Sequence, residues 1–121
     1  GKSKWDINLS SINPLVISGE TIFVMDINGR LLSLEKKTGK LIWAVQLRVK
    51  KNNKEIVWSG PILSTNKLLI VSSDGLVLSL SPFTGKTLSK IKFEESFLSN
   101  PFHVGEDIYL ISKQGTLYVL G

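Results

Sequence analysis

The 121-residue sequence contains no cysteine, a single histidine and no long apolar run. Without cysteine the chain has no disulfide framework, no thiolate zinc site and no cysteine nucleophile. Its longest apolar runs, such as Leu68–Val71, cover only a few residues and cannot span a membrane. The chain begins with Gly1 and shows no charged-then-apolar leader, so we expect any targeting signal to lie outside these residues. The compartment stays open, because proteins without disulfides occur in oxidising and reducing compartments alike.

Positive charge is concentrated in one part of the chain. Fifteen lysines and arginines oppose ten acidic residues, which gives a net charge of +5. Seven of the basic residues fall between Lys36 and Lys54, and the others are scattered singly. The composition, 42% hydrophobic and 21% charged, is that of a globular protein. We therefore interpret the charge as one local basic region and not as the mark of a generally basic protein.

Short apolar runs separated by turn residues recur along the chain. They are rich in Ile, Val, Leu and aromatic residues and are too short for helices. The glycines that mark the same turn in successive copies, Gly29, Gly75 and Gly115, lie 46 and 40 residues apart, a spacing typical of propeller blades. No segment has the period of a helix. The sequence predicts an all-β fold, a β-propeller fragment of four-stranded antiparallel blades with about three blades' worth of strands.

Turn residues give the expected boundaries of the strands. Asn28-Gly29 and Asp74-Gly75 predict two-residue hairpin turns, because such turns need positive φ. Gly39 and Gly85, each between a threonine and a lysine, mark the next turn of their copies. We expect twelve strands: the outer strand of a preceding blade in residues 1–9, blades in 13–47 and 61–93, and three strands of a further blade in 100–121.

Neither the first nor the last of these blades is complete in this interpretation. A blade cannot bury its faces alone, so it needs neighbours. The strand in residues 1–9 lacks the other three strands of its blade, and the last three strands lack a fourth. Open faces and strand edges favour association. We predict that the isolated chain self-associates, with the first strand of one molecule completing the last blade of another.

The repeat itself resembles a known family. The stretch from Gly29 to Leu34, followed by Thr38-Gly39-Lys40 and by Trp43, resembles the repeat of quinoprotein-like (PQQ-repeat) propellers, in which the tryptophan packs against a neighbouring blade. Trp5 falls at the same position of an earlier copy. Ser89 stands where the next tryptophan is expected, so we expect one weaker contact between blades.

Within that group the chain is similar to the lipoproteins that assist assembly of outer-membrane proteins, over nearly its whole length and at roughly their last third. Residues 5–13, 56–75 and 114–118 carry this resemblance. It implies a non-catalytic protein-binding scaffold on the periplasmic side of the outer membrane, lipid-anchored through a segment outside this sequence. The implied partners are other subunits of the barrel assembly complex, namely the periplasmic domains of its barrel protein. The family's docking residues lie mostly in blades upstream of this segment.

Two other functions stay open, a fragment of a quinone-dependent dehydrogenase and an unrelated sensor or adhesion propeller. Dehydrogenases with this repeat hold cofactor and calcium at the ring centre through acidic and amide ligands, often with adjacent cysteines. Here the carboxylates sit mostly in turns or beside lysines, so we expect no catalytic residue, cofactor or metal in this segment. His103 lies in an apolar strand and is expected to be packed or at the surface instead of acting as a base or ligand.

The link after Leu47 is much longer than the corresponding link after Leu9, and it is basic. Loops on a rigid scaffold commonly carry binding residues. Two interpretations stay open: a solvated loop kept soluble by its charge, or a docking loop for an acidic partner surface or anionic lipid headgroups. Nucleic acid is not expected, because Trp43 and Trp58 fall at repeat positions that pack the blades. The candidate partner-binding residues are Arg48, Lys50, Lys51 and Lys54.

Overall fold

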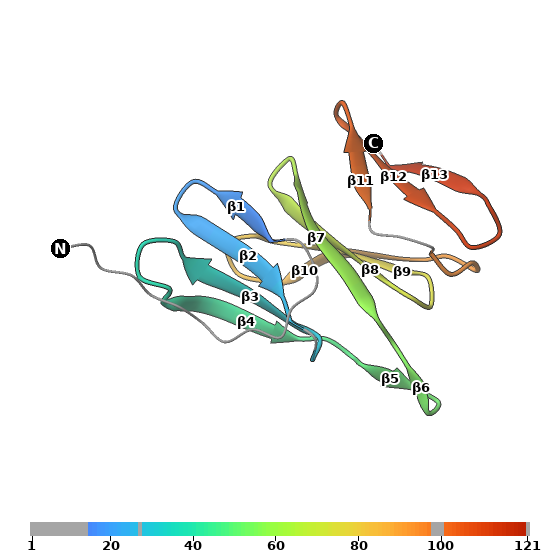
Figure 1. Cartoon of the computed structure of the whole chain (residues 1–121), viewed down its shortest axis with the longest axis horizontal. Coiled ribbons are helices and arrows are strands. Elements are labelled where there is room, and N and C mark those ends of the chain that lie inside the picture. The colour runs from blue at the N-terminus through green and yellow to red at the C-terminus, as the bar shows by residue number, and fades with distance from the viewer. Residues whose placement is uncertain (1–14, 27, 98–100, 121) are drawn as a thin grey trace.

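The structure is a computed structural model that describes residues 15–26, 28–97 and 101–120. Within these ranges it has thirteen strands and no helix. The strands form two four-stranded antiparallel sheets, one three-stranded sheet and a two-stranded hairpin (Figure 1). The predicted all-β fold of four-stranded blades is confirmed. Nothing helical in the described ranges is long or apolar enough to cross a lipid bilayer.

Each blade is a meander in which strands that follow one another in sequence lie side by side. The first blade contains β1 (Val16–Ser18), β2 (Thr21–Met25), β3 (Arg30–Glu35) and β4 (Leu41–Gln46). The second contains β7 (Trp58–Ser64), β8 (Lys67–Ser72), β9 (Leu76–Leu80) and β10 (Thr87–Lys92). The third contains β11 (Phe102–Val104), β12 (Asp107–Ile111) and β13 (Leu117–Leu120). The strand predicted in residues 1–9, with Trp5, lies outside the described residues.

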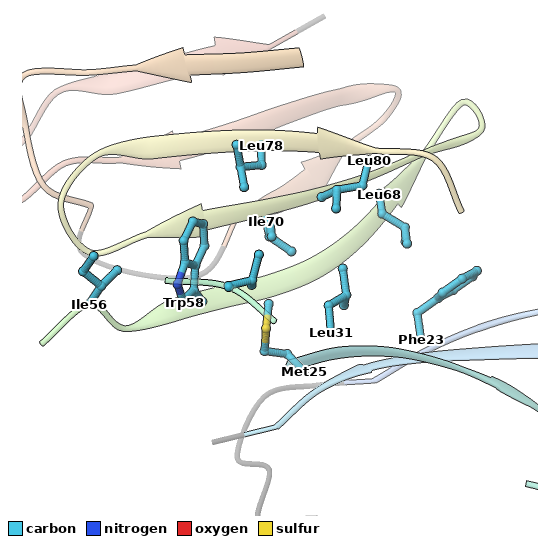
Figure 2. Packing of buried hydrophobic residues seen from close by; sticks show 10 residues of the cluster. Phe23, Met25, Leu31, Ile56, Trp58, Leu68, Ile70, Leu78 and Leu80 are labelled. Atoms are coloured by element: carbon cyan, nitrogen blue, oxygen red, sulfur yellow. The ribbon is translucent and has the colours of Figure 1, made fainter. Parts of the chain in front are cut away.

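The hydrophobic core lies between the blades. Phe23, Met25 and Leu31 of the first blade meet Ile70 and Leu80 of the second, and Figure 2 shows these side chains pointing toward one another. A second cluster joins the second and third blades through Val71, Val77, Phe97 and Leu110. Each such side chain contributes roughly 1.5–3 kcal/mol when fully buried.

Strand β8 shows why the apolar runs are continuous. Successive side chains of a strand point to opposite faces of its sheet. Leu68 and Ile70 therefore pack toward the first blade, while Val71 packs toward the third. A strand that is covered on both faces has no solvent-facing positions for polar residues, unlike a strand in a one-sided sheet.

Trp43 in β4 fastens the first blade to the second. Its indole Nε1 donates a hydrogen bond of 3.0 Å to the carbonyl of Pro82. Its ring lies so close to Gly85 that a Cβ there would stand 2.7 Å from the ring carbon Cε3. Ser89 holds the corresponding position in β10 and lines a hollow of about 590 Å³ between the second and third blades. The replacement of tryptophan by serine thus coincides with an unfilled space at the next contact.

The turns at Gly29, Gly75 and Gly115 are built alike. In each, the glycine N–H donates to the carbonyl three residues earlier at 3.1 Å, and the glycine has φ of +77°, +95° or +92°. Two-residue turns were expected at Gly29 and Gly75, and that expectation is wrong. Three residues separate the bonded pairs Asp26–Arg30 and Ser112–Thr116.

A side-chain oxygen explains the wider turns. Asp26 Oδ1 accepts from the backbone N–H of Arg30 at 3.0 Å, and Ser112 Oγ accepts from that of Thr116 at the same distance. Ser72 Oγ bonds the N–H four residues later at 2.9 Å. Side chains of Asp and Ser commonly cap turns in this way. The capped three-residue loop leaves only the glycine at positive φ among the described residues of these turns.

The stretch expected as a loop after Leu47 folds into a hairpin of β5 (Lys50–Lys51) and β6 (Lys54–Glu55). Its turn residues, Asn52 and Asn53, have φ of +52° and +63°. Positive φ at both central residues is the hairpin turn whose twist matches that of the strands, and asparagine tolerates it. The strand count therefore exceeds the expected twelve even though the first expected strand is not described.

Candidate functional site

The hairpin of residues 48–55, here called the basic hairpin, projects away from the blades (Figure 1). Its base is fixed by three hydrogen bonds. Trp58 Nε1 donates to the carbonyl of Arg48 at 2.7 Å, and the backbone N–H of Ile56 donates to the carbonyl of Val49 at 2.8 Å. Leu47 N–H donates to the Gly29 carbonyl at 2.8 Å. The basic hairpin is therefore an anchored arm and not an unstructured loop.

A hollow of about 380 Å³ lies between the base of this hairpin and the second blade. We call it the basic hollow. The hairpin contributes Arg48 and Lys51, and β10 contributes Lys90 and Lys92. The other lining residues come from the start of β7 and the turn into β9: Ile56, Trp58, Asp74 and Leu76.

Among the described residues, Asp74 is the one carboxylate that lines the basic hollow. Burial on its own raises the pKa of Asp74, but the hydrogen bond from Ser72 and the ammonium groups of Lys92 and Lys51 outweigh it and hold that pKa below its usual range. Lys92 Nζ lies 3.7 Å from Asp74 Oδ2 and also donates to the Asp74 carbonyl. Asp74 is thus ionised at neutral pH, and it forms an ion pair with Lys92.

The basic hollow keeps an excess of positive charge. Counted over the described residues, four cations line it against one carboxylate, a net charge of +3. Arg48, Lys51 and Lys90 form no ion pair within 4.0 Å in the part of the chain that the structure describes. Concentrated, unpaired positive charge in a concave surface attracts anions.

The structure separates the four residues predicted to bind a partner into two pairs. Arg48 and Lys51 line the basic hollow, whereas Lys50 and Lys54 lie on the hairpin without lining it. Sequence reasoning missed Lys90 and Lys92. Their spacing of two residues places both side chains on one face of β10. Only the folded structure shows that this face lies beside the basic hairpin.

A second polar group joins the link after β10 to β13. The Tyr118 hydroxyl donates to Glu95 Oε2 at 2.7 Å, and Thr116 Oγ1 donates to Glu95 Oε1 at 3.1 Å. The Tyr118 ring packs on Phe93, with centroids 4.7 Å apart. Hydrogen bonding lowers the pKa of Glu95, and the same bond from Tyr118 raises the pKa of that tyrosine. Sequence reasoning gave this glutamate no role.

Other predicted residues occupy structural positions. Gly39 and Gly85 each donate to the carbonyl four residues earlier, at 2.7 and 2.8 Å. His103 is exposed in β11, and its Nε2 lies 3.1 Å from the carbonyl oxygen of Leu63 in β7, across the contact between two blades. Within the described ranges, no three His, Asp or Glu side chains converge as metal ligands would.

Comparison with known proteins agrees with this architecture. A family model described as "Outer membrane protein assembly factor BamB" matches residues 1–79. The crystal structure of BamB from Moraxella catarrhalis superposes with a TM-score of 0.68 at 22% identity, covering 96% of this chain and 35% of that one. At that identity the likeness shows the fold.

Curated relatives match nearly the whole chain. Outer membrane protein assembly factor BamB of Salmonella typhimurium is 24% identical over 121 residues, which cover 99% of this chain and 30% of the relative. The protein of the same name from Shewanella oneidensis is 26% identical over 124 residues, 99% of this chain and 29% of the relative. The chain therefore spans about 30% of the length of the relatives it matches.

Proposed function

The chain belongs to the family of outer membrane protein assembly factor BamB, and from this membership we propose that it serves as a non-catalytic, protein-binding scaffold of the outer-membrane barrel assembly machinery. The observation that carries the proposal is the match over nearly the whole chain to relatives named as assembly factors. Its place would be the periplasmic side of the outer membrane. Its partners would be the periplasmic domains of the barrel protein.

The fold supports a scaffold by its stiffness. The blades bury each other's faces through two shared hydrophobic clusters. Because such close-packed contacts resist deformation, we expect the exposed surface of the blades to change little when a partner binds. A rigid surface loses less conformational entropy when it binds, and more of the contact energy appears as affinity. The fragment of a quinone-dependent dehydrogenase and the sensor or adhesion propeller are not favoured, because the matched relatives carry the name of an assembly factor.

The basic hairpin is the part of this chain that we assign to partner contact. It carries Arg48, Lys50, Lys51 and Lys54 on an anchored arm, and all four side chains are exposed. Charged groups on a projecting arm guide an oppositely charged partner and accelerate encounter, an effect that salt screens.

Capture of the purified periplasmic domains of the barrel protein by the immobilised full-length protein that contains this chain tests the proposal. We expect specific, salt-sensitive binding that weakens about tenfold or more when Lys50, Lys51 and Lys54 are changed to glutamate. The matched control reverses three exposed lysines of the blade turns, Lys37, Lys40 and Lys86. Failure of the unaltered full-length protein to bind overturns the scaffold function. Equal weakening in both triple variants would assign the effect to net charge and overturn the role of the hairpin.

A further inference from the structure

We propose that the basic hollow binds an acidic side chain of an extended protein segment whose neighbouring apolar side chain enters the same hollow. The proposal deepens the scaffold function and rests on it. It adds Lys90 and Lys92 of the second blade to a surface that the hairpin alone would not form.

The positive charge converges from two separate elements. Arg48 and Lys51 reach the hollow from the hairpin, and Lys90 reaches it from β10. Lys92 pairs with Asp74 at 3.7 Å, and Lys51 acts on the same carboxylate from beyond ion-pair distance. Among the described residues, Arg48, Lys51 and Lys90 therefore form no ion pair within 4.0 Å. An incoming carboxylate would accept charge-assisted hydrogen bonds from more than one of them, and such bonds are stronger than neutral ones.

The inner wall of the hollow is apolar and firmly held. Ile56 and Trp58 are buried members of the first hydrophobic cluster, and Leu76 packs against it. The Trp58 indole is further fixed by its bond to the Arg48 carbonyl. A volume of about 380 Å³ lies in the range of small ligand sites, of ~300–1,000 Å³. Such a wall favours a ligand that brings an apolar side chain together with its charge.

The shape of the site favours a protein segment over a lipid surface. A bilayer presents a broad array of headgroups, which would meet lysines on a projecting arm. Lys50 and Lys54 lie on that arm outside the lining of the hollow, whereas Arg48, Lys51 and Lys90 line a concavity that a broad bilayer surface does not enter.

Titration of the chain with a fluorescent peptide of alternating glutamate and leucine tests the proposal. The hollow variant carries Arg48→Gln with Lys90→Gln, and the matched control carries Lys37→Gln with Lys86→Gln, two exposed lysines outside the lining of the hollow, so both variants lose two charges. We expect the hollow variant to weaken binding about tenfold or more and the control less than about threefold. A peptide of alternating glutamate and serine should bind more weakly than the leucine peptide. Thermal melting shows whether each variant remains folded, and Lys90→Gln alone provides a second, milder variant.

Equal weakening by the two variants, equal affinity for the serine and leucine peptides, or binding to phosphatidylglycerol vesicles without peptide binding would each overturn the proposal. Its failure is separable from failure of the scaffold function. If the chain captures the periplasmic domains but ignores the peptide, the hollow proposal fails alone. Peptide binding that depends on the hollow, without capture of the domains, overturns the scaffold function instead.

Discussion

At the scale of single residues, Gly75 and Gly115 occupy the same turn in different surroundings. Both have positive φ, +95° and +92°. A Cβ added at Gly75 would stand 2.5 Å from the Phe93 carbonyl oxygen and 2.6 Å from that of Glu95. At the corresponding position of Gly115, no heavy atom of the described residues beyond its two chain neighbours lies within 4 Å. Gly115 is therefore needed for its backbone conformation alone, whereas Gly75 is also needed for close approach of the link after β10.

This contrast predicts unequal effects of alanine. Gly115→Ala should cost about 1–2 kcal/mol, the strain of a left-handed conformation in a residue with a Cβ. Gly75→Ala should cost about 1–3 kcal/mol more, because two backbone oxygens must move. Urea denaturation of both variants measures the difference in free energy of unfolding. Equal destabilisation would show that the link after β10 can move to accommodate the added Cβ without a loss in free energy of unfolding.

The glycine positions could be predicted from sequence, but the type of turn could not. Gly29 and Gly75 follow residues that favour a two-residue turn, and the dipeptides carry no information about a partner farther along the chain. The capping oxygens of Asp26 and Ser72 lie outside those dipeptides. Their hydrogen bonds to residues four positions later widened both loops.

At the scale of elements, the blade strands could be predicted and the basic hairpin could not. Blade strands carry dense apolar runs, which mark burial on both faces. Strands β5 and β6 consist of charged residues and bury none of them, and Asn52-Asn53 is a weaker turn signal than Asn-Gly. The contribution of Lys90 and Lys92 to the basic hollow could not be predicted either. It depends on β10 lying beside the hairpin, which is a matter of tertiary packing.

The bond between Glu95 and Tyr118 should make stability depend on pH. The pKa of Glu95 is lowered in the folded chain, so its stabilisation is present above its ordinary pKa of 4.5 and is lost as the pH falls through the folded value. Tyr118, whose pKa is raised, stays protonated throughout this range. Tyr118→Phe keeps the ring contacts and removes the hydroxyl, so its melting temperature should fall less between about pH 7 and about pH 3.

The control is Tyr109→Phe, which removes a hydroxyl from the neighbouring strand β12 and keeps the ring that stacks on Phe102 at 5.7 Å. This variant should keep the acid dependence of the unaltered chain. Melting curves at several pH values compare the three proteins. An identical loss of stability in all three would remove Glu95 and Tyr118 from the acid transition.

At the scale of the whole molecule, β13 pairs only with β12 in the described part of the chain. Leu117 and Val119 on this strand are 54% and 52% exposed. Unpaired edges with apolar side chains favour strand addition. We therefore expect the 121-residue chain to self-associate, with residues 1–9 of one molecule adding to β13 of another.

Sedimentation velocity over a range of concentrations measures this association. We expect assemblies that dissociate on dilution, and a chain without residues 1–9 should remain monomeric at concentrations where the longer chain associates. A monomer at every concentration contradicts the expectation. Undiminished association of the shortened chain would point to the blade faces instead of the strand edge.

The stacking of blades could be predicted from the repeat, because each copy carries more apolar residues than one sheet can cover. The quality of each contact between blades was only partly foreseeable. Ser89 in place of tryptophan indicated a weaker contact, but the hollow beside it depends on the approach of β13. Residue identity predicts which contact changes, and packing decides how much space is left.

Because of this difference, we expect the contact between the first and second blades to be more stable than the contact between the second and third blades. Trp43 links the first pair of blades through its hydrogen bond to the Pro82 carbonyl, whereas Ser89 lines an open hollow of about 590 Å³ at the contact of the second pair. Heat or mechanical load should open the contact between the second and third blades first, because a hollow open to solvent supplies fewer dispersion contacts between the two sheets. The third blade would then separate from the second while the first two blades remained packed together.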